Sequence, residues 1–300
     1  MAPRADALKM RALRIHGYGG PEVMRLDEVP VPQPQAGERL VKLAAASVNP
    51  IDWKMREGLM AAPLPRVLGR DGAGTDVVTG ERILGIGSPG REGTHAEYAV
   101  FAEGSCAPVP EGVGFEAAAA LGIAALSAWI PLVENAAVGP GQRVLIHAGA
   151  GGVGSFAIQI AHLRGAEVWT TCSAANADWC RALGAYRTID YAREDFTACG
   201  AIFDVVLDTL GGAVHRRSAR VLKPGGTLTY LNAVPVEAVS QVHVKVMPTE
   251  VRATRERLDR LLMLGLRIPV EKRFPLDEGG AAYELSRAGH VRGKIVLQIA

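Results

Sequence analysis

One glycine-rich segment constrains the fold of this chain more than any other feature. Gly149, Gly151 and Gly154 match the pattern G-x-G-x-x-G, after a predicted strand at 142–148 and before a predicted helix at 155–164. In this setting the first glycine permits a tight turn, the second lets the backbone approach a pyrophosphate, and the third lets helix and strand pack closely. The helix N-terminus adds free N–H groups and the positive end of the helix dipole. The segment therefore predicts a dinucleotide-binding site, and its context favours this over a flexible glycine turn.

Alternating strands and helices surround the glycine loop. The predicted helices lie at 115–136, 177–183, 213–222 and 250–264, and the predicted strands at 166–172, 202–208 and 226–232. This alternation is typical of a parallel sheet with helices on both faces. Residues 10–115 instead contain short strands joined by glycine and proline turns, at 10–19, 39–49 and 92–101, and a last strand is predicted at 293–299. We therefore predict an α/β protein with a β domain and a doubly wound Rossmann domain.

The charge balance argues against a nucleic-acid partner. The 300-residue chain has 33 Lys and Arg against 31 Asp and Glu, a net charge of +2. Its richest basic stretch, 252–260, alternates arginines with Glu256 and Asp259, which is typical of a solvated helix face. We expect no nucleic-acid binding.

Membrane insertion and secretion are not predicted either. The most apolar stretch, 117–133, is interrupted by Gly122 and Pro131, and we expect it to be too short and too broken to span a bilayer. The first nine residues are polar and lack the apolar core of a signal peptide. The four cysteines form no C-x-x-C pair, which favours free thiols in a reducing compartment. We expect a cytoplasmic protein without membrane contact.

The end of the second Rossmann strand addresses which dinucleotide binds. A site for NAD usually carries an acidic residue there that binds the ribose 2′-hydroxyl. Residues 171–176 read TCSAAN and contain no carboxylate. Ser173 and Asn176 offer hydrogen bonds to a 2′-phosphate, and Tyr191 ends the following strand. We therefore favour NADPH, with the alternative that these are ordinary strand-end and helix-cap residues.

Seven segments in order along almost the whole chain resemble one known family. They are AASVNPIDWKMREG (45–58), VLGRDGAG (67–74), GTHAEYAV (93–100), GQRVLIHAGAGGVGSFAIQIA (141–161), VVLDTLGG (205–212), LKPGGTL (222–228) and RGKIVLQI (292–299). The chain resembles the medium-chain dehydrogenase/reductases, specifically the zinc-independent quinone oxidoreductase (zeta-crystallin-like) branch. The resemblance implies a GroES-like catalytic domain at 1–115 and 246–300 around a Rossmann NADP(H)-binding domain at 116–245.

The resemblance also implies roles for individual residues. Those expected at the substrate side of the nicotinamide, in a cleft between the two domains, are Asn49, Asp52, Trp53 and Ser127. Those expected to contact the cofactor are Gly149, Gly151, Gly152, Val153, Gly154, Ser173, Asn176, Tyr191, Thr209, Leu210, Gly211, Leu231, Asn232 and Lys294. Each has a structural alternative: Asp52 caps a turn, Trp53 belongs to the core, or Lys294 solvates an edge strand.

Metal ligands of the zinc-dependent relatives are replaced in this sequence. Asn49 stands where those relatives carry a cysteine, and Gly69-Arg70-Asp71 replaces their Gly-His-Glu run. We therefore predict no bound metal. Without a Lewis acid to stabilise an alkoxide, hydride transfer from NADPH to a small electrophile, a quinone or an activated C=C bond, is the expected reaction.

Two alternatives and two departures stay open. The alternatives are a biosynthetic tailoring enoyl or ketone reductase, and an NADPH-binding regulatory or structural protein with little catalysis. The usual lysine after the second strand is missing, and the stretches 74–85 and 233–250 are shorter than usual. We also expect a homodimer that forms through the edge of the Rossmann sheet at 226–232 and the residues after it.

Overall fold

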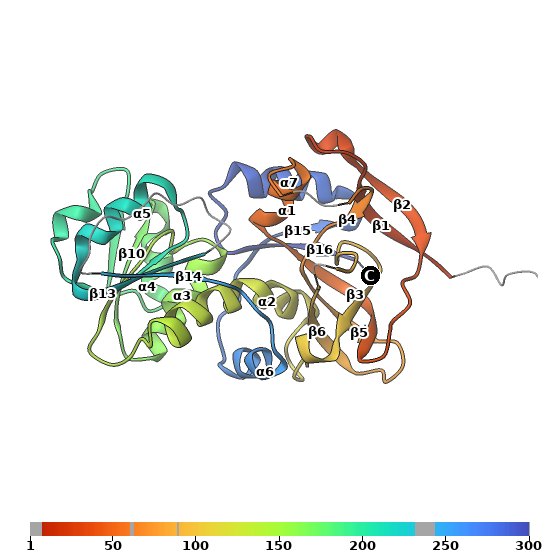
Figure 1. Ribbon diagram of the computed structural model, residues 1–300, viewed down its shortest axis with the longest axis horizontal. Helices are drawn as coiled ribbons and strands as arrows, with labels where there is room; N and C mark the ends of the chain where they lie inside the picture. Colours follow the sequence, from red (N-terminus) through yellow and green to blue (C-terminus); the bar gives the residue numbers. More distant parts are fainter. Residues whose placement is uncertain (1–7, 61–62, 89, 232–243, 300) are drawn as a thin grey trace, which may run out of the picture. The chain divides into compact units, whose positions relative to one another are not determined.

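The computed structural model describes residues 8–60, 63–88, 90–231 and 244–299, which fold as two compact units (Figure 1). Unit 1 comprises Met1–Ile123 and Ala253–Ala300, and unit 2 comprises Ala124–Arg252. The C-terminal segment therefore joins the N-terminal half of the chain. The change from one unit to the other falls inside helix α2 (Phe115–Trp129), whereas the sequence suggests a boundary before that helix.

Unit 1 is built on two antiparallel-rich sheets. The smaller has the order β2-β1-β4, and the larger the order β15-β16-β3-β5-β6-β8, with β7 also paired to β3. The strands are β1 (Lys9–Ile15), β2 (Met24–Pro30), β3 (Glu38–Val48), β4 (Arg66–Val67), β5 (Asp71–Asp76), β6 (Arg82–Ile86), β7 (Tyr98–Ala102), β8 (Cys106–Pro108), β15 (Val270–Pro275) and β16 (Lys294–Gln298). The helices are α1 (Pro50–Arg56), α6 (Arg255–Met263) and α7 (Gly279–Ala288). Helix α7 contacts both α1 and β16.

Strand β3 explains how unit 1 buries a polar site. Its first half alternates, with Val41 and Leu43 buried and Lys42 exposed between them, as expected for a strand with one solvated face. Its last four residues, Ala45–Val48, are all buried, because β5 and β16 pair with opposite edges of this part of the strand. The chain that leaves β3 at Asn49 therefore starts inside the unit.

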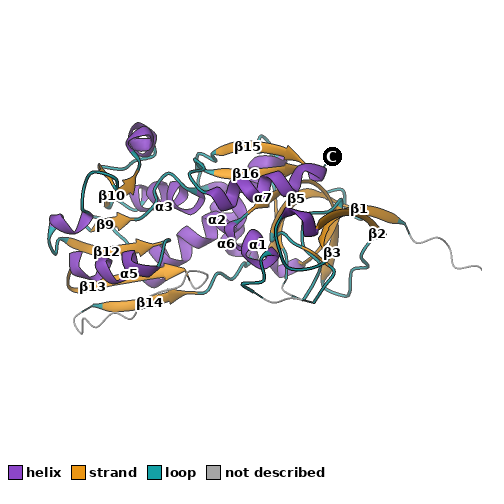
Figure 2. Ribbon diagram, turned by 90° about the horizontal axis from the view of Figure 1, so that it is seen from above, coloured by secondary structure: helices purple, strands orange, loops and turns teal. Residues whose placement is uncertain are grey.

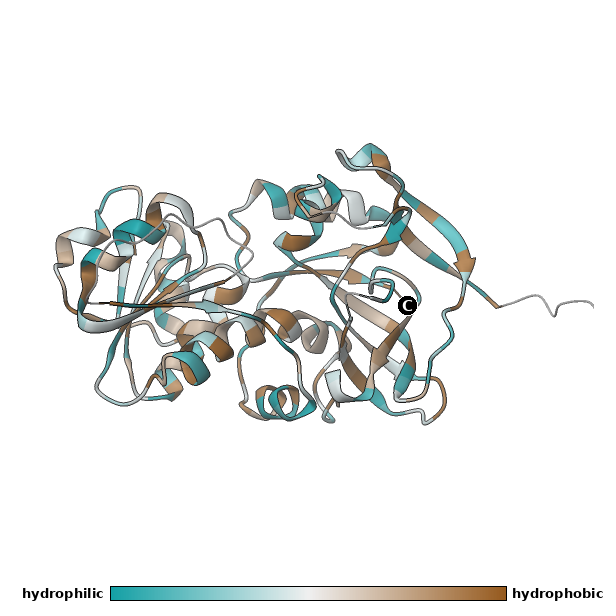
Figure 3. Cartoon of the chain, in the orientation of Figure 1, coloured by the Kyte–Doolittle hydropathy of each residue, from teal (hydrophilic) through white to brown (hydrophobic). Residues whose placement is uncertain are grey.

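Unit 2 is a six-stranded parallel sheet with the order β11-β10-β9-β12-β13-β14. Its strands are β9 (Arg143–Ile146), β10 (Glu167–Cys172), β11 (Arg187–Asp190), β12 (Phe203–Asp208), β13 (Leu222–Leu231) and β14 (Lys245–Thr249), and its helices are α3 (Gly152–Leu163), α4 (Ala177–Ala182) and α5 (Gly212–Ser218). Figure 2 shows β9, β12, β13 and β14 side by side, and Figure 3 shows the apolar residues along these strands. The strand order reverses between β9 and β12, as in a doubly wound fold. The predicted Rossmann architecture is confirmed.

The long apolar helix corrects one expectation. Helix α2 continues through a π-helical turn (Ile130–Asn135), and together they form a 21-residue helix that is long and apolar enough to cross a membrane by length and composition alone. The expectation that Gly122 and Pro131 break this segment is wrong, because Pro131 lies in the wider π turn, where its missing N–H is tolerated. Within the protein, 78% of the most apolar window is buried, so packing accounts for its composition.

Several predicted element boundaries are also wrong. The helix predicted at 250–264 begins only at Arg255, because Thr254 caps it by accepting a hydrogen bond from Arg257 N at 3.3 Å. The helix predicted at 213–222 ends at Ser218, and Leu222 already belongs to β13. Strand β13 is not the edge of the sheet, since β14 pairs with it in parallel and forms that edge in the part of the chain that the structure describes.

Candidate functional site

The glycine loop of unit 2 joins β9 to α3, as predicted. A Cβ atom on Gly149 would lie 2.0 Å from Thr170 Oγ1, and a Cβ atom on Gly154 would lie 2.2 Å from the carbonyl oxygen of Ala148. Packing of the protein itself therefore requires glycine at both positions. A Cβ atom on Gly151 would be 3.4 Å from its nearest neighbour, Ala148 O. Glycine at 151 is thus not required by the fold, which points to a ligand that approaches the backbone there.

The first backbone N–H groups of this loop are hydrogen-bonded within the protein itself. Gly149 N donates to Thr171 O at 2.9 Å and Ala148 N donates to Thr171 Oγ1 at 3.1 Å, so the preceding turn is satisfied by β10. Gly151 is the N-cap of α3 and has no side chain to cap the helix. The N–H groups of the first helical turn have no carbonyl partner within any α-helix. The N–H of Gly151 itself donates to Ala148 O at 3.0 Å, so the N–H groups of Gly152 and Val153, beside the small Gly151, form the cradle that fits a pyrophosphate.

The ends of β10 and β11 bring three predicted cofactor residues together. Cys172 pairs with Asp190 in parallel register, and Tyr191 N donates to Cys172 O at 3.3 Å, so Ser173 and Tyr191 leave the sheet as neighbours. Asn176 Nδ2 donates to Ser173 Oγ at 3.1 Å. The phenol of Tyr191 is exposed.

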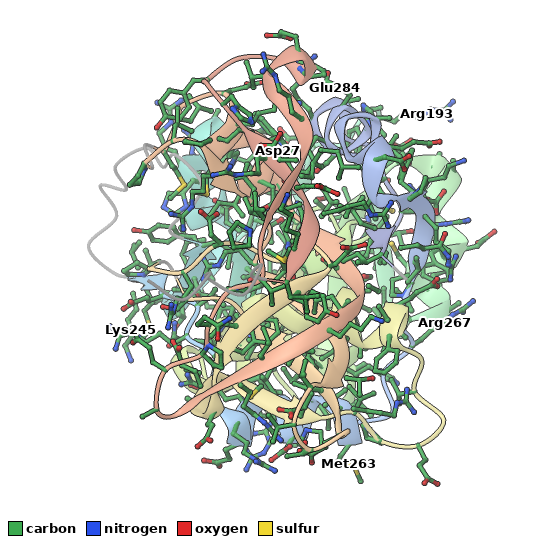
Figure 4. All side chains as sticks on the ribbon, turned by 90° about the vertical axis from the view of Figure 1, so that its right-hand side faces the viewer. Asp27, Arg193, Lys245, Met263, Arg267 and Glu284 are labelled. Atoms are coloured by element: carbon green, nitrogen blue, oxygen red, sulfur yellow. The ribbon has the colours of Figure 1, made fainter. Side chains whose placement is uncertain are left out.

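One cation near this end was missed by the sequence analysis. Arg193 follows Tyr191 on the same loop, and its side chain projects into solvent (Figure 4). Its guanidinium Nε is 3.9 Å from Asp190 Oδ2, a loose pairing that leaves the group available to an anion. Reading the loop after β11, and not only the end of β10, would have found it.

Hydrogen bonds to buried groups fix the loop at Thr209–Gly211. Asp208 Oδ1 accepts from Leu210 N at 2.9 Å and Gly211 N at 3.0 Å, and Asp208 Oδ2 lies 2.8 Å from His215 Nδ1. Thr209 Oγ1 donates to the carbonyl oxygen of His147 at 3.0 Å. The backbone of this loop is therefore fixed while the Leu210 side chain remains half exposed. Of the remaining predicted residues, Leu231 ends β13, Ser127 is buried in α2, and Asn232 lies outside the described residues.

Unit 1 contains a buried cluster of polar side chains around Asn49. Asn49 is the N-cap of α1, and its N–H donates to Asp52 Oδ2 at 2.7 Å in a capping box. Its side-chain Nδ2 donates to Asp71 Oδ1 at 2.7 Å, and its Oδ1 accepts from Lys294 Nζ at 2.6 Å. Lys294 Nζ also donates to Val48 O at 3.2 Å. The structure thus brings Asn49, Asp52 and Lys294 together, and adds Asp71 as a residue that the sequence analysis did not place in the site.

Helix α2 closes this cluster on another side. Ile123 N donates to Asp71 Oδ2 at 2.8 Å. A Cβ atom on Gly122 would lie 2.8 Å from that carboxylate oxygen, so glycine permits the close approach of helix and strand. Both oxygens of Asp71 are therefore engaged, and its side chain is completely buried.

Burial shifts the ionisation of the groups in the cluster. Burial raises the pKa of Asp52 to about 7, against the hydrogen bond from Asn49 N, which favours the carboxylate. Burial also lowers the pKa of the Lys294 ammonium, and the negative charges of Asp71 and Asp52 oppose that effect. Asp52 Oδ1 has no hydrogen-bond partner among the residues that the structure describes. The cluster therefore favours one proton on Asp52 at pH values below 7.

His95 is an electrically neutral part of the same interior. Its Nε2 lies 3.1 Å from Ser47 O and its Nδ1 lies 2.6 Å from Tyr283 Oη. Because a carbonyl only accepts, Nε2 carries the hydrogen and Nδ1 accepts from the tyrosine. Burial lowers the pKa of His95 to about 4. This histidine therefore has a structural role as a neutral link.

Trp53 lies on α1, one residue after Asp52. Its half-buried ring packs against the main apolar core of unit 1, and its indole N–H is buried without a hydrogen-bond partner among the described side chains. Among residues 8–60, 63–88, 90–231 and 244–299, no three His, Cys, Asp or Glu side chains form a group that could hold a metal ion.

Comparisons with known proteins agree with this architecture. Residues 35–86 match the family described as alcohol dehydrogenase GroES-like domain, and residues 183–297 match the family described as zinc-binding dehydrogenase. The chain is 30% identical to a chloroplastic quinone-oxidoreductase homolog of Spinacia oleracea, over 96% of this chain and 98% of that protein. It is 31% identical to a chloroplastic NADPH-dependent alkenal/one oxidoreductase of Arabidopsis thaliana, over 96% of this chain and 79% of that protein.

A solved structure resembles the whole chain. The quinone oxidoreductase from Coxiella burnetii superposes with a TM-score of 0.93 at 34% identity, covering 98% of this chain and 100% of that one. Unit 1 is thus a GroES-like domain and unit 2 a Rossmann domain. The chain is an oxidoreductase that belongs to the zinc-independent quinone oxidoreductase family of the medium-chain dehydrogenase/reductases.

Proposed function

We propose that this protein is an NADPH-dependent reductase that transfers hydride to a quinone or to the activated C=C bond of an enone or enal, without zinc. The observation that carries the proposal is the carboxylate-free end of β10, where Ser173 and Tyr191 leave the sheet side by side next to the glycine loop. An acidic residue at this end would repel a 2′-phosphate, whereas hydroxyl groups can donate hydrogen bonds to it.

The residues of unit 2 fit NADPH in three places. Gly152 and Val153 offer backbone N–H groups to the pyrophosphate, and Gly151 leaves room for its approach, within the loop fixed by Gly149 and Gly154. The groups offered to the 2′-phosphate are Ser173, Asn176, Tyr191 and Arg193. Those offered to the nicotinamide end are Thr209, Leu210, Gly211 and Leu231. When bound, the cofactor supplies a hydride from C4 of its nicotinamide ring.

Residues of unit 1 and α2 supply the substrate side of the proposal. We assign Asn49, Asp52, Trp53 and Ser127 to this side, and Lys294 to the support of Asn49 through the bond of 2.6 Å. Reduction of an enone or quinone places negative charge on the carbonyl oxygen, and oriented N–H donors stabilise that charge. The assignment of this substrate class is supported by similarity to two relatives, a quinone-oxidoreductase homolog and an NADPH-dependent alkenal/one oxidoreductase.

Cofactor affinity tests the first half of the proposal. We expect NADPH to bind at least about tenfold more tightly than NADH, a difference of about 1.4 kcal/mol. Ser173→Asp should weaken NADPH and favour NADH, because the new charge repels the 2′-phosphate, whereas the same substitution at Ser105, in the short helical turn Glu103–Ser105 of unit 1, serves as the control. Equal affinities of the wild-type protein for the two cofactors would reject the NADPH assignment.

Substrate screening tests the second half. NADPH oxidation is followed with quinones, enals, enones and enoyl thioesters. Turnover of enoyl thioesters alone would favour a biosynthetic enoyl reductase. Tight NADPH binding without turnover of any electrophile would favour a regulatory or structural protein.

We further propose a cytoplasmic homodimer. The four cysteines are free thiols, which suits a reducing compartment. Among the strands that the structure describes, β14 is the last of the Rossmann sheet, its Val246 is exposed, and an open strand edge of this kind pairs readily with a second copy. Light scattering at micromolar concentration tests the dimer, and a monomer mass rejects it.

A further inference from the structure

The side-chain amide of Asn49 is fixed between two charged partners of opposite sign. An ammonium group only donates hydrogen bonds, and a carboxylate only accepts them. Lys294 Nζ at 2.6 Å therefore identifies Oδ1 of Asn49, and Asp71 Oδ1 at 2.7 Å identifies its Nδ2. The amide has one orientation that satisfies both neighbours. Asp71 takes one of the two hydrogens on Nδ2, and the second remains for another acceptor.

A lysine at position 294 carries a free-energy cost, because its charged group is removed from water. Its side chain is almost completely buried, and burial lowers the pKa of its ammonium group. Replacement of a buried ionic group by an apolar one of similar size is often neutral or stabilising. The hydrogen bonds to Val48 O at 3.2 Å and to Asn49 Oδ1 therefore indicate a role beyond stability.

We propose that Lys294 is a positioning residue for hydride transfer, which acts through Asn49 rather than on the cofactor. Its ammonium group fixes the amide and draws electron density through Oδ1, which strengthens the remaining Nδ2–H as a donor. That hydrogen is presented to the carbonyl oxygen of the electrophile, where negative charge develops. This inference rests on the proposed function.

In this arrangement the buried Lys294 ammonium group supports the reaction without contacting the substrate. Asp71 is held by Ile123 N at 2.8 Å, so it cannot turn away from the amide. Lys294 and Asp71 together prevent the amide from rotating by 180°, which would point Oδ1 at the substrate oxygen. Loss of the ammonium group removes both the polarisation and half of this constraint.

Lys294→Met tests the inference, because methionine fills the stem without the charge. We expect kcat to fall by about 10- to 100-fold, the effect of a weakened oxyanion donor, while the dissociation constant of NADPH changes by less than about twofold. In Lys294→Ala, added methylammonium or propylammonium should restore turnover in a saturable manner, which a purely structural defect would not show. The matched control is Lys223→Met, which breaks a Lys–Asp pair to Asp204 of 2.8 Å in unit 2 and should leave kcat unchanged.

A second measurement does not depend on turnover. The ¹⁵N side-chain amide resonances of Asn49, assigned through Asn49→Gln, should move in Lys294→Met and stay in place in Lys223→Met. If the wild-type protein is active and Lys294→Met retains more than half of its kcat, this inference is overturned and the proposed function stands. An Asn49 side-chain amide resonance with the same chemical shift in Lys294→Met as in the wild-type protein would also overturn it. A wild-type protein that reduces no electrophile would overturn the proposed function and this inference with it.

Discussion

The pH dependence of stability should change sharply when Asp52 becomes asparagine. Burial raises the pKa of this carboxyl from 3.8 to about 7 in the folded protein. The folded state therefore binds a proton that the unfolded state has already lost. Stability from this proton is fully present below pH 3.8 and is lost as the pH rises through 7. Asp52→Asn keeps a neutral acceptor for Asn49 N and removes the titration.

The magnitude follows from the two pKa values. Between pH 5 and pH 8, the titration of Asp52 should cost the wild-type protein roughly 2.5 kcal/mol of unfolding free energy. Asp52→Asn lacks this loss, so its stability difference between pH 8 and pH 5 should be more positive by that amount. In melting temperature the difference is about 5–10 °C for a unit of this size. The unpaired amide hydrogens cost the same at both pH values and cancel.

Calorimetry and urea unfolding at pH 5 and pH 8 provide the assay. Trp53 is the single tryptophan of unit 1, so its fluorescence in a background with the other three tryptophans changed to phenylalanine reports on this unit. His95, whose pKa burial lowers to about 4, loses its contribution as the pH falls from 6.5, but equally in both proteins.

Asp76→Asn is the matched control. Asp76 is a buried acid of unit 1 whose pKa is lowered below 3.8, because hydrogen bonds from Thr79 and Val78 outweigh the opposing effect of burial. Its contribution to stability is present above pH 3.8 and lost only below that value. Asp76→Asn should therefore destabilise equally at pH 5 and pH 8. If the stability difference between Asp52→Asn and the wild-type protein were also the same at pH 5 and pH 8, the assignment of a proton to Asp52 would be refuted.

Three further predictions concern the two halves of the site. Gly154→Ala should unfold or strongly destabilise unit 2 because its Cβ would lie 2.2 Å from Ala148 O, whereas Gly151→Ala should keep the melting temperature and weaken NADPH binding, as measured by calorimetry. Trp53→Ala should lower turnover in steady-state kinetics and leave NADPH affinity within about twofold. Asp208→Ala removes the acceptor of two backbone N–H groups and should raise the KM for NADPH. Hydrogen exchange should show a loosened loop at 209–211 in Asp208→Ala and an unchanged loop in Gly151→Ala.

The sequence predicts the Rossmann unit well because its signals are local. The glycine loop, the buried strands and the alternating helices each occupy one short stretch of chain. Helix α1 also has a local signal, since Asn49 and Asp52 form a capping box with Pro50 between them; from the sequence, a cap at Asp52 is only the structural alternative, and no helix is predicted there. Helix α7 begins with two glycines, and burial of Tyr283 against the core of unit 1 compensates for that weak start.

The cluster around Asn49 was beyond reach for a different reason. Apart from the local pair Asn49 and Asp52, its charged members come from positions 71 and 294, and no local pattern connects these to Asn49. Their contact depends on which residues of β3 pair with β5 and β16, which is a property of register. Register is set by burial over the whole sheet, so a single sequence without its pairings leaves it undetermined.

The register of β3 explains why these three side chains share one face. Val48 pairs with Ile295, so Asn49 and Lys294 come directly opposite each other as the antiparallel pairing ends. On the other edge, a bulge between Leu43 and Ala45 shifts the pairing with β5 by one residue. After this shift Ala46 pairs with Gly72, which sets Asp71 opposite Ser47, two residues from Asn49 and therefore on the same face.

Without the bulge, Asp71 would fall opposite Ala46, and its carboxylate would point to the other side of the sheet. The amide of Asn49 would then have a cation behind it and no acceptor to hold its nitrogen. Gly74 makes the bulge possible, because a Cβ atom there would lie 2.0 Å from the carbonyl oxygen of Lys42. Gly74, three residues after Asp71 on the same strand, thus decides whether the buried charges can orient the same amide.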